Sequence, residues 1–145
     1  MSSESEAKLA VKVLDSWAVL AWLKDQPPAA DVVEAIWQEA REGNIRLLIN
    51  IINLGEVFYI AAKVREIELA ELILEELQKL PFEIYPVSNS LVIDAARIKG
   101  QYAISYADAF AVVTAQKEGA TLVTGDPELK ALVGRGIVAI EWIGP

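Results

Sequence analysis

Residues 11–23, VKVLDSWAVLAWL, join a short apolar run to a helical pattern through one acid, Asp15. The same order of apolar segment, acid and helical pattern occurs three more times. Glu56 lies in INIINLGEVFYIAA (49–62), Asp108 in YAISYADAFAVVTA (102–115) and Asp126 in TLVTGDPELKAL (121–132). In a protein of alternating strands and helices, such positions fall at one edge of a parallel sheet, where ligand crevices form.

The chain as a whole has the pattern of an α/β fold with a central parallel sheet. Residues 8–145 are expected to form one domain, and residues 1–7 a disordered N-terminal tail. The helices at 53–65 and 67–80 are expected to form a projecting hairpin. We expect strands at 11–14, 45–49, 82–87, 121–124 and 137–142, and helices at 16–23, 31–42, 53–65, 67–80, 88–102, 105–118 and 126–133.

Composition excludes several kinds of chemistry. The 145 residues include no histidine and no cysteine. Histidine-dependent nucleophilic catalysis, disulfides and thiolate metal sites are therefore excluded, and the lack of cysteine fits a cytoplasmic protein. The net charge of −8 argues against tight nonspecific binding to nucleic acid, although metal ions can screen phosphates locally.

The chain is apolar for its size. Hydrophobic residues make up 54% of it and the mean hydropathy is +0.33, yet no charge-free run approaches the length of a membrane helix. The start MSSESEAK has no signal-peptide pattern. We expect the surplus apolar surface to form a subunit interface.

Each of the four acids has a simple alternative role as a helix cap. Asp15 and Asp126 occupy N-cap positions, and Pro127 follows at a favoured first helical position. Asn53 with Glu56, and Ser105 with Asp108, resemble capping boxes. Capping explains an acid at one helix start, but it does not explain why all four should lie at the same edge of one sheet.

Four converging carboxylates require compensation. Two carboxylates about 6 Å apart repel by roughly 3 kcal/mol at an effective dielectric constant near 20. Helix dipoles, protonation or a cation can offset this repulsion. An oxygen-only ligand set suits Mg²⁺ or Mn²⁺, which can activate water to attack a phosphodiester.

These four segments resemble the PIN-domain family of metal-dependent ribonucleases, and most closely the toxin subunits of VapBC toxin–antitoxin pairs. The resemblance covers nearly the whole chain, from Val11 to about Trp142. It implies a PIN-like, Rossmann-like three-layer α/β/α sandwich with a central five-stranded parallel sheet. It also implies Mg²⁺- or Mn²⁺-dependent endoribonuclease activity, a homodimer and a small antitoxin partner.

The resemblance also implies roles for individual residues. Asp15 and Asp108 become the core metal ligands, and Glu56 and Asp126 complete the catalytic cluster directly or through water. Ser16, Thr124 and Asn53 are weaker supporting candidates, for which local capping is an equal alternative. Basic residues that could contact RNA are few, and Lys63 and Arg65 are interpreted as surface charges.

Two other functions stay open. The chain could be a PIN nuclease of RNA processing or quality control, or a non-catalytic interaction module with the same fold. A small antitoxin gene beside this one would favour the toxin. A phosphatase with an Asp nucleophile is disfavoured because Trp17 stands where a second Asp is usual, and an NTPase is disfavoured because there is no phosphate-binding glycine loop.

Overall fold

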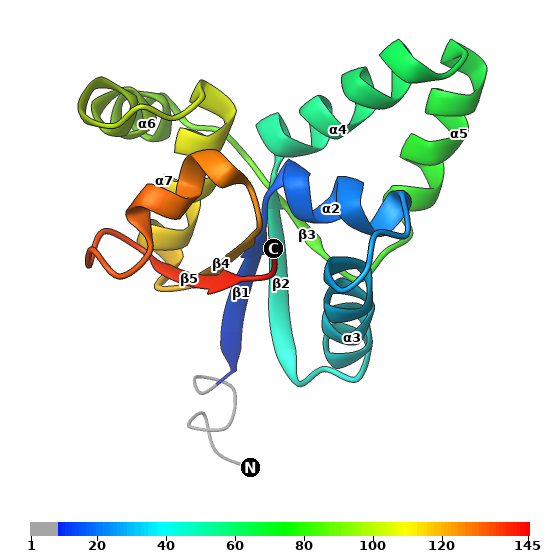
Figure 1. Ribbon diagram of the computed structural model, residues 1–145, viewed down its shortest axis with the longest axis horizontal. Coiled ribbons are helices and arrows are strands. Elements are labelled where there is room, and N and C mark those ends of the chain that lie inside the picture. The colour runs from blue at the N-terminus through cyan, green and yellow to red at the C-terminus, as the bar shows by residue number, and fades with distance from the viewer. Residues whose placement is uncertain (1–8) are drawn as a thin grey trace.

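The computed structural model describes residues 9–145, and the expected disordered tail lies outside the described residues. Five parallel strands form one sheet in the order β3-β2-β1-β4-β5 (Figure 1). The elements are β1 (Ala10–Leu14), α2 (Ser16–Leu23), α3 (Ala29–Arg41), β2 (Ile45–Asn50), α4 (Ile51–Val64), α5 (Ile67–Leu77), β3 (Glu83–Tyr85), α6 (Asn89–Gln101), α7 (Tyr106–Glu118), β4 (Thr121–Thr124), the 3₁₀ helix η1 (Pro127–Leu132) and β5 (Ala139–Trp142).

Helices cover both faces of the sheet, so the predicted three-layer sandwich with five parallel strands is confirmed. Successive strand residues point to opposite faces. Leu14 and Val123 face a core built with α2 and α3, whereas Val13 and Leu122 face a core built with α6 and α7. Because both faces are buried, the strands read as continuous apolar runs in the sequence.

The structure corrects the predicted start of α4. The helix begins at Ile51, and Asn50 is its N-cap, with Asn50 Oδ1 accepting a 2.8 Å hydrogen bond from Ile52 N. The capping box predicted for Asn53 and Glu56 is therefore wrong. Asn50 lies at the end of an apolar run, and its side chain caps the helix three residues before Asn53, the predicted cap.

Helix α3 begins at Ala29, two residues before its predicted start, whereas three predicted caps are confirmed. Asp15 and Asp126 are N-caps, accepting hydrogen bonds of 2.9 Å from Ala18 N and Glu128 N. Ser105 caps α7, and its Oγ accepts a 3.1 Å hydrogen bond from Asp108 N. The short helix predicted after Asp126 is present as a 3₁₀ helix, as is common for short connectors.

Helices α4 and α5 extend away from the sheet beside α2, as the predicted hairpin requires (Figure 1). They remain attached to the body through buried side chains at their ends nearest the sheet. Leu54 and Val57 of α4 and Leu77 of α5 belong to the same core as α2 and α3. The outer parts of both helices carry exposed apolar residues, including Val64, Ile67 and Leu72.

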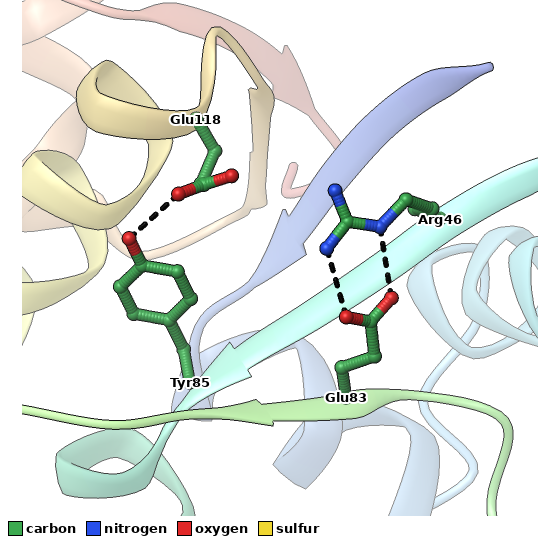
Figure 2. Close-up of polar contacts among 4 residues, drawn as sticks. All are labelled: Arg46, Glu83, Tyr85 and Glu118. Carbon is green, nitrogen blue, oxygen red and sulfur yellow. Dashed lines mark hydrogen bonds and ion pairs between the residues drawn. The ribbon is translucent and has the colours of Figure 1, made fainter. Parts of the chain in front are cut away.

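Polar pairs fasten the short edge strand β3 to its surroundings (Figure 2). Arg46 of β2 forms a two-pronged ion pair with Glu83 of β3, at 2.8 and 2.9 Å. Tyr85 donates a 2.7 Å hydrogen bond to Glu118 at the end of α7. The Arg46–Glu83 pair is largely exposed, so it contributes at most about 1 kcal/mol to stability.

None of the helices in residues 9–145 combines the length and apolar character that a membrane crossing requires.

Candidate metal centre

The pairing register of the sheet places three polar residues in one row. Leu14 of β1 pairs with Ile49 of β2 and with Val123 of β4. The next residues along the three strands are Asp15, Asn50 and Thr124, and all three are fully buried. This row lies where the strand order reverses around β1, the usual position for a ligand site in an open α/β sheet.

Asp15 is fixed by the groups around it. Its Oδ1 accepts a hydrogen bond from Ala18 N, and its Oδ2 accepts one from Thr124 Oγ1. Thr124 Oγ1 in turn accepts a 3.0 Å hydrogen bond from Asp126 N. Thr124 therefore connects two of the acids, by orienting the Asp15 carboxylate and the backbone that carries Asp126.

Asp108 comes to the same place from the first turn of α7. Its backbone is held by the Ser105 cap, and Ser105 N itself donates a 2.9 Å hydrogen bond to Glu128 Oε1 on η1. Asp108 is buried, and its Oδ2 is buried without a hydrogen-bond partner. An unpartnered buried carboxylate oxygen is uncommon, since most buried polar atoms are satisfied.

The structure brings together three of the four acids predicted from the sequence. Asp15, Asp108 and Asp126 each offer a carboxylate oxygen, and these oxygens lie within 4.8 Å of one another. Glu56 is not a member of this group. Glu56 Oε1 accepts a hydrogen bond from Ser16 Oγ, so the Glu56 carboxylate contacts the residue that follows Asp15.

Burial and mutual repulsion raise the proton affinity of the cluster. Burial raises the pKa of Asp15 to about 7, although hydrogen bonds from Thr124 and Ala18 oppose the change. Burial also raises the pKa of Asp108 to about 8, and the nearby charges of Asp126 and Asp15 raise it further. Near neutral pH the cluster therefore tends to hold protons, and a cation would offset the same repulsion.

The donor set fits a hard divalent cation. All the candidate ligand atoms are carboxylate oxygens, which Mg²⁺ and Mn²⁺ prefer. Asp108 Oδ2 has no hydrogen-bond partner, so it is available as a ligand atom for a cation. A cation bound there would satisfy this atom and lower the pKa values of Asp15 and Asp108.

Two polar residues support the centre from behind. Asn53 lies inside α4, where it is fully buried, and its Nδ2 donates a 3.0 Å hydrogen bond to Ala107 O, next to Asp108. Asn50, which the sequence analysis missed, donates a 2.9 Å hydrogen bond from Nδ2 to Thr114 Oγ1. In the sequence, Asn50 could have been noticed as a single amide side chain at the end of an apolar segment.

Comparison with known protein families matches residues 12–134 to the PIN domain. The chain belongs to the PIN domain family. The matched segment includes Asp15, Glu56, Asp108 and Asp126, and it spans most of the described sheet. Comparison with curated proteins found no significant match.

Several solved structures, among them members of the VapBC family of toxin–antitoxin systems, have a similar fold. The DNA-bound VapBC of Salmonella typhimurium superposes with a TM-score of 0.71 at 20% identity, covering 92% of this chain and 98% of that one. VapBC2 of Rickettsia felis, bound to a DNA fragment from its promoter, gives 0.68 at 20% identity, covering 90% and 97%. FitAcB of Neisseria gonorrhoeae gives 0.64 at 19% identity, covering 89% and 95%. At these identities the similarity concerns the fold.

Proposed function

We propose that the chain is an Mg²⁺- or Mn²⁺-dependent endoribonuclease and the toxin of a type II toxin–antitoxin pair. The observation that carries the proposal is the convergence of Asp15, Asp108 and Asp126, with one oxygen of Asp108 buried and unpartnered. Membership of the PIN family supports a nuclease. The structural similarity to toxin–antitoxin complexes supports the toxin role.

In this proposal Asp15, Asp108 and Asp126 hold the cation directly. When bound, the cation activates water and neutralises charge on the phosphodiester. Glu56 lies outside the three-carboxylate group, so we assign it to a water-mediated or proton-accepting role at the rim, held by Ser16. Thr124 orients Asp15, and Asn53 holds the backbone carbonyl next to Asp108.

A cleavage assay tests the activity. The purified protein should cleave single-stranded RNA with millimolar Mg²⁺ or Mn²⁺ and stop when EDTA is added. Asp126→Asn should lose most of this activity, although Asn caps a helix as well as Asp does. Cleavage that persists in EDTA, or full activity of Asp126→Asn, would contradict the proposal.

An apolar groove between α2, α4 and α5 supports the antitoxin as a partner. Two adjoining cavities of about 330 Å³ each share Leu23, Leu69 and Ile73 in their walls. Such a groove fits the apolar face of an amphipathic helix. Lys24 and Arg65 line one end and Glu76 the other, so charged residues on the partner could fix its direction.

We also propose a homodimer that acts in the cytoplasm. Exposed apolar residues outside the groove, such as Ile84, Ile93 and Val133, support a self-association surface. Light scattering at micromolar concentrations should give twice the monomer mass of 15.9 kDa. A strictly monomeric protein would contradict this part of the proposal.

Binding of a small protein at this groove distinguishes a toxin from a nuclease of RNA processing. Co-expression with the product of a small adjacent gene should yield a stable complex, relieve growth arrest and block cleavage. Leu69→Glu should abolish the complex while cleavage by the free protein continues. If no small protein binds and expression does not slow growth, the role in RNA processing becomes the better proposal.

A further inference from the structure

The outer face of α4 carries an exposed aromatic ring and a cation beside the acidic centre. Glu56, Tyr59 and Lys63 follow at spacings of four residues or fewer, which places them along one side of the helix. The Tyr59 hydroxyl lies 3.5 Å from Glu56 Oε2, and Lys63 Nζ lies 5.3 Å from the centre of the Tyr59 ring. Tyr59 is 49% exposed, so about half of the residue's surface is accessible to a ligand.

Lys63 is available for an anion. Among the described residues, two lysines form salt bridges: Lys12 with Glu141, and Lys79 with Glu76. Among residues 9–145, no carboxylate forms a salt bridge with Lys63. Two other cations, Lys130 and Arg135, also lie over aromatic rings, but Lys63 is the one whose ring, Tyr59, contacts Glu56 beside the acidic centre. The contact with Tyr59 orients Lys63 without neutralising it.

Gly55 leaves open space one helical turn before Tyr59. Glycine inside a helix lowers its stability relative to alanine. Packing does not require a glycine here, because a Cβ placed on Gly55 meets no heavy atom within 4 Å, and Gly55 is not among the glycines with positive φ. Packing therefore does not explain Gly55, which leaves bare, exposed backbone one helical turn before Tyr59.

A flat ring, a free cation and a bare backbone surface match the needs of a stacked nucleotide. Proteins that hold single-stranded nucleic acid combine aromatic stacking with basic contacts to the phosphates. The rise from Glu56 to Lys63 is about 10 Å along the helix axis. A nucleotide held there would neighbour the scissile one, and its phosphate could reach Lys63.

We propose that Gly55, Tyr59 and Lys63 form a subsite for one nucleotide of single-stranded RNA. The base stacks on Tyr59 over Gly55, and the phosphate contacts Lys63. This inference rests on the proposed ribonuclease function and specifies where the substrate is held. It replaces the interpretation of Lys63 as a simple surface charge.

Binding of a short, end-labelled single-stranded RNA tests the subsite. The Asp15→Asn background in millimolar Mg²⁺ prevents cleavage, so fluorescence anisotropy reports affinity alone. Tyr59→Leu should weaken binding roughly 5- to 150-fold, whereas Tyr59→Phe should retain most of the affinity because the ring remains. Lys63→Gln should lower the slope of log affinity against log salt by about 0.7, and Lys79→Gln, in the turn after α5, should leave binding unchanged.

Gly55→Ala separates a binding role from a folding role. It should raise the melting temperature by about 2–4 °C, as alanine does inside a helix, while weakening RNA binding several-fold. If Gly55→Ala and Tyr59→Leu both bind RNA as tightly as the parent, the subsite does not exist. If Gly55→Ala dissociates a dimer without changing RNA affinity, this face is a subunit contact and the inference is wrong.

The two proposals fail in different ways. Wild-type protein that binds RNA through Tyr59 but never cleaves it would reject the nuclease and keep the subsite. A Tyr59→Leu variant that cleaves RNA with the wild-type KM would keep the nuclease and reject the subsite. Loss through KM, with kcat nearly unchanged, is the expected result, because stacking holds the substrate equally in the ground and transition states.

Discussion

At the scale of single residues, Asp15 has two roles that normally conflict. It caps α2 through Oδ1, which needs a hydrogen-bond acceptor but no charge. It also faces Asp108 and Asp126, where a buried charge is costly without a cation. Thr124 donates to Oδ2 and partly offsets that cost. Capping and the site can therefore be separated by removing the charge and keeping the shape.

Asp15→Asn and Asp108→Asn should abolish RNA cleavage while leaving the fold intact. Because each substitution removes a carboxyl group whose ionisation is costly in this buried cluster, thermal stability in EDTA should be unchanged or higher at neutral pH. Asp94→Asn is the matched control, since Asp94 is exposed on α6 and pairs only with Arg97. Cleavage assays and melting curves in EDTA check both parts. Full activity of the two site variants would leave the acids with a capping role alone.

Asn53→Ala should weaken the support of Asp108. It removes the hydrogen bond to Ala107 O and leaves that carbonyl without the amide donor, at a cost of roughly 1–3 kcal/mol. Activity should fall further than stability explains, because the first turn of α7 loses its fixed position. Chemical denaturation and kcat measurements check this, with exposed Asn44→Ala as the control. A fall in stability with unchanged kcat would make Asn53 purely structural.

At the scale of elements, the crossing of the β4–η1 loop over the C-terminal segment positions Asp126. A Cβ on Gly125 would collide with the Trp17 ring and lie 2.7 Å from the Gly144 Cα. Trp17 follows Ser16 on α2, so this contact holds the Asp126 loop against the helix that begins at Asp15. Any side chain at residue 125 must move one of these backbones.

Gly125→Ala should therefore destabilise the protein by about 1–3 kcal/mol and weaken metal binding by displacing Asp126. Gly100→Ala is the contrast, because it lies inside α6 with nothing within 4 Å of an added Cβ. It should stabilise the fold by up to about 1 kcal/mol. Denaturation midpoints and a Mn²⁺ titration measure both effects. Equal stability of the two variants would show that the loop yields easily.

At the scale of the whole molecule, folding, protonation and metal binding are linked. The ordinary pKa of Asp15 and Asp108 is 3.8, and the folded protein raises these pKa values to about 7 and 8. Between about pH 4 and pH 8 the folded state holds protons that the unfolded chain has released. Stability therefore falls as pH rises through this window.

The metal-free protein should melt at a higher temperature at pH 5 than at pH 8. Divalent cations should reverse this at pH 8, adding about 2.7 kcal/mol at 100 times the dissociation constant. Melting curves with EDTA, Mg²⁺ and Mn²⁺ at both pH values measure the effect, and Asp108→Asn should flatten the metal-free pH dependence. A metal-free protein that is most stable at pH 8 would reverse the predicted sign.

Much of the fold followed from local patterns. The apolar runs at β1, β2 and β4 and the caps at Asp15, Ser105 and Asp126 were readable because strand and helix signals act over a few residues. The start of α4 could not be predicted in this way, because Asn50 and Asn53 both have a side-chain amide that can cap a helix. Only the packing of α4 on α7 decides which one caps the helix and which one is buried against Ala107.

The sequence by itself determined the order of strands and helices, the oxygen-only chemistry and the four acids that end apolar segments. The tertiary structure decided which acids meet. The register of β1 with β4 brings Asp15 to Thr124, and the first turn of α7 adds Asp108, whereas α4 directs Glu56 towards Ser16. It also decided that Gly55, Tyr59 and Lys63 share one open face. The reason is physical: local propensity fixes where an element begins, but distances between elements depend on long-range packing and register.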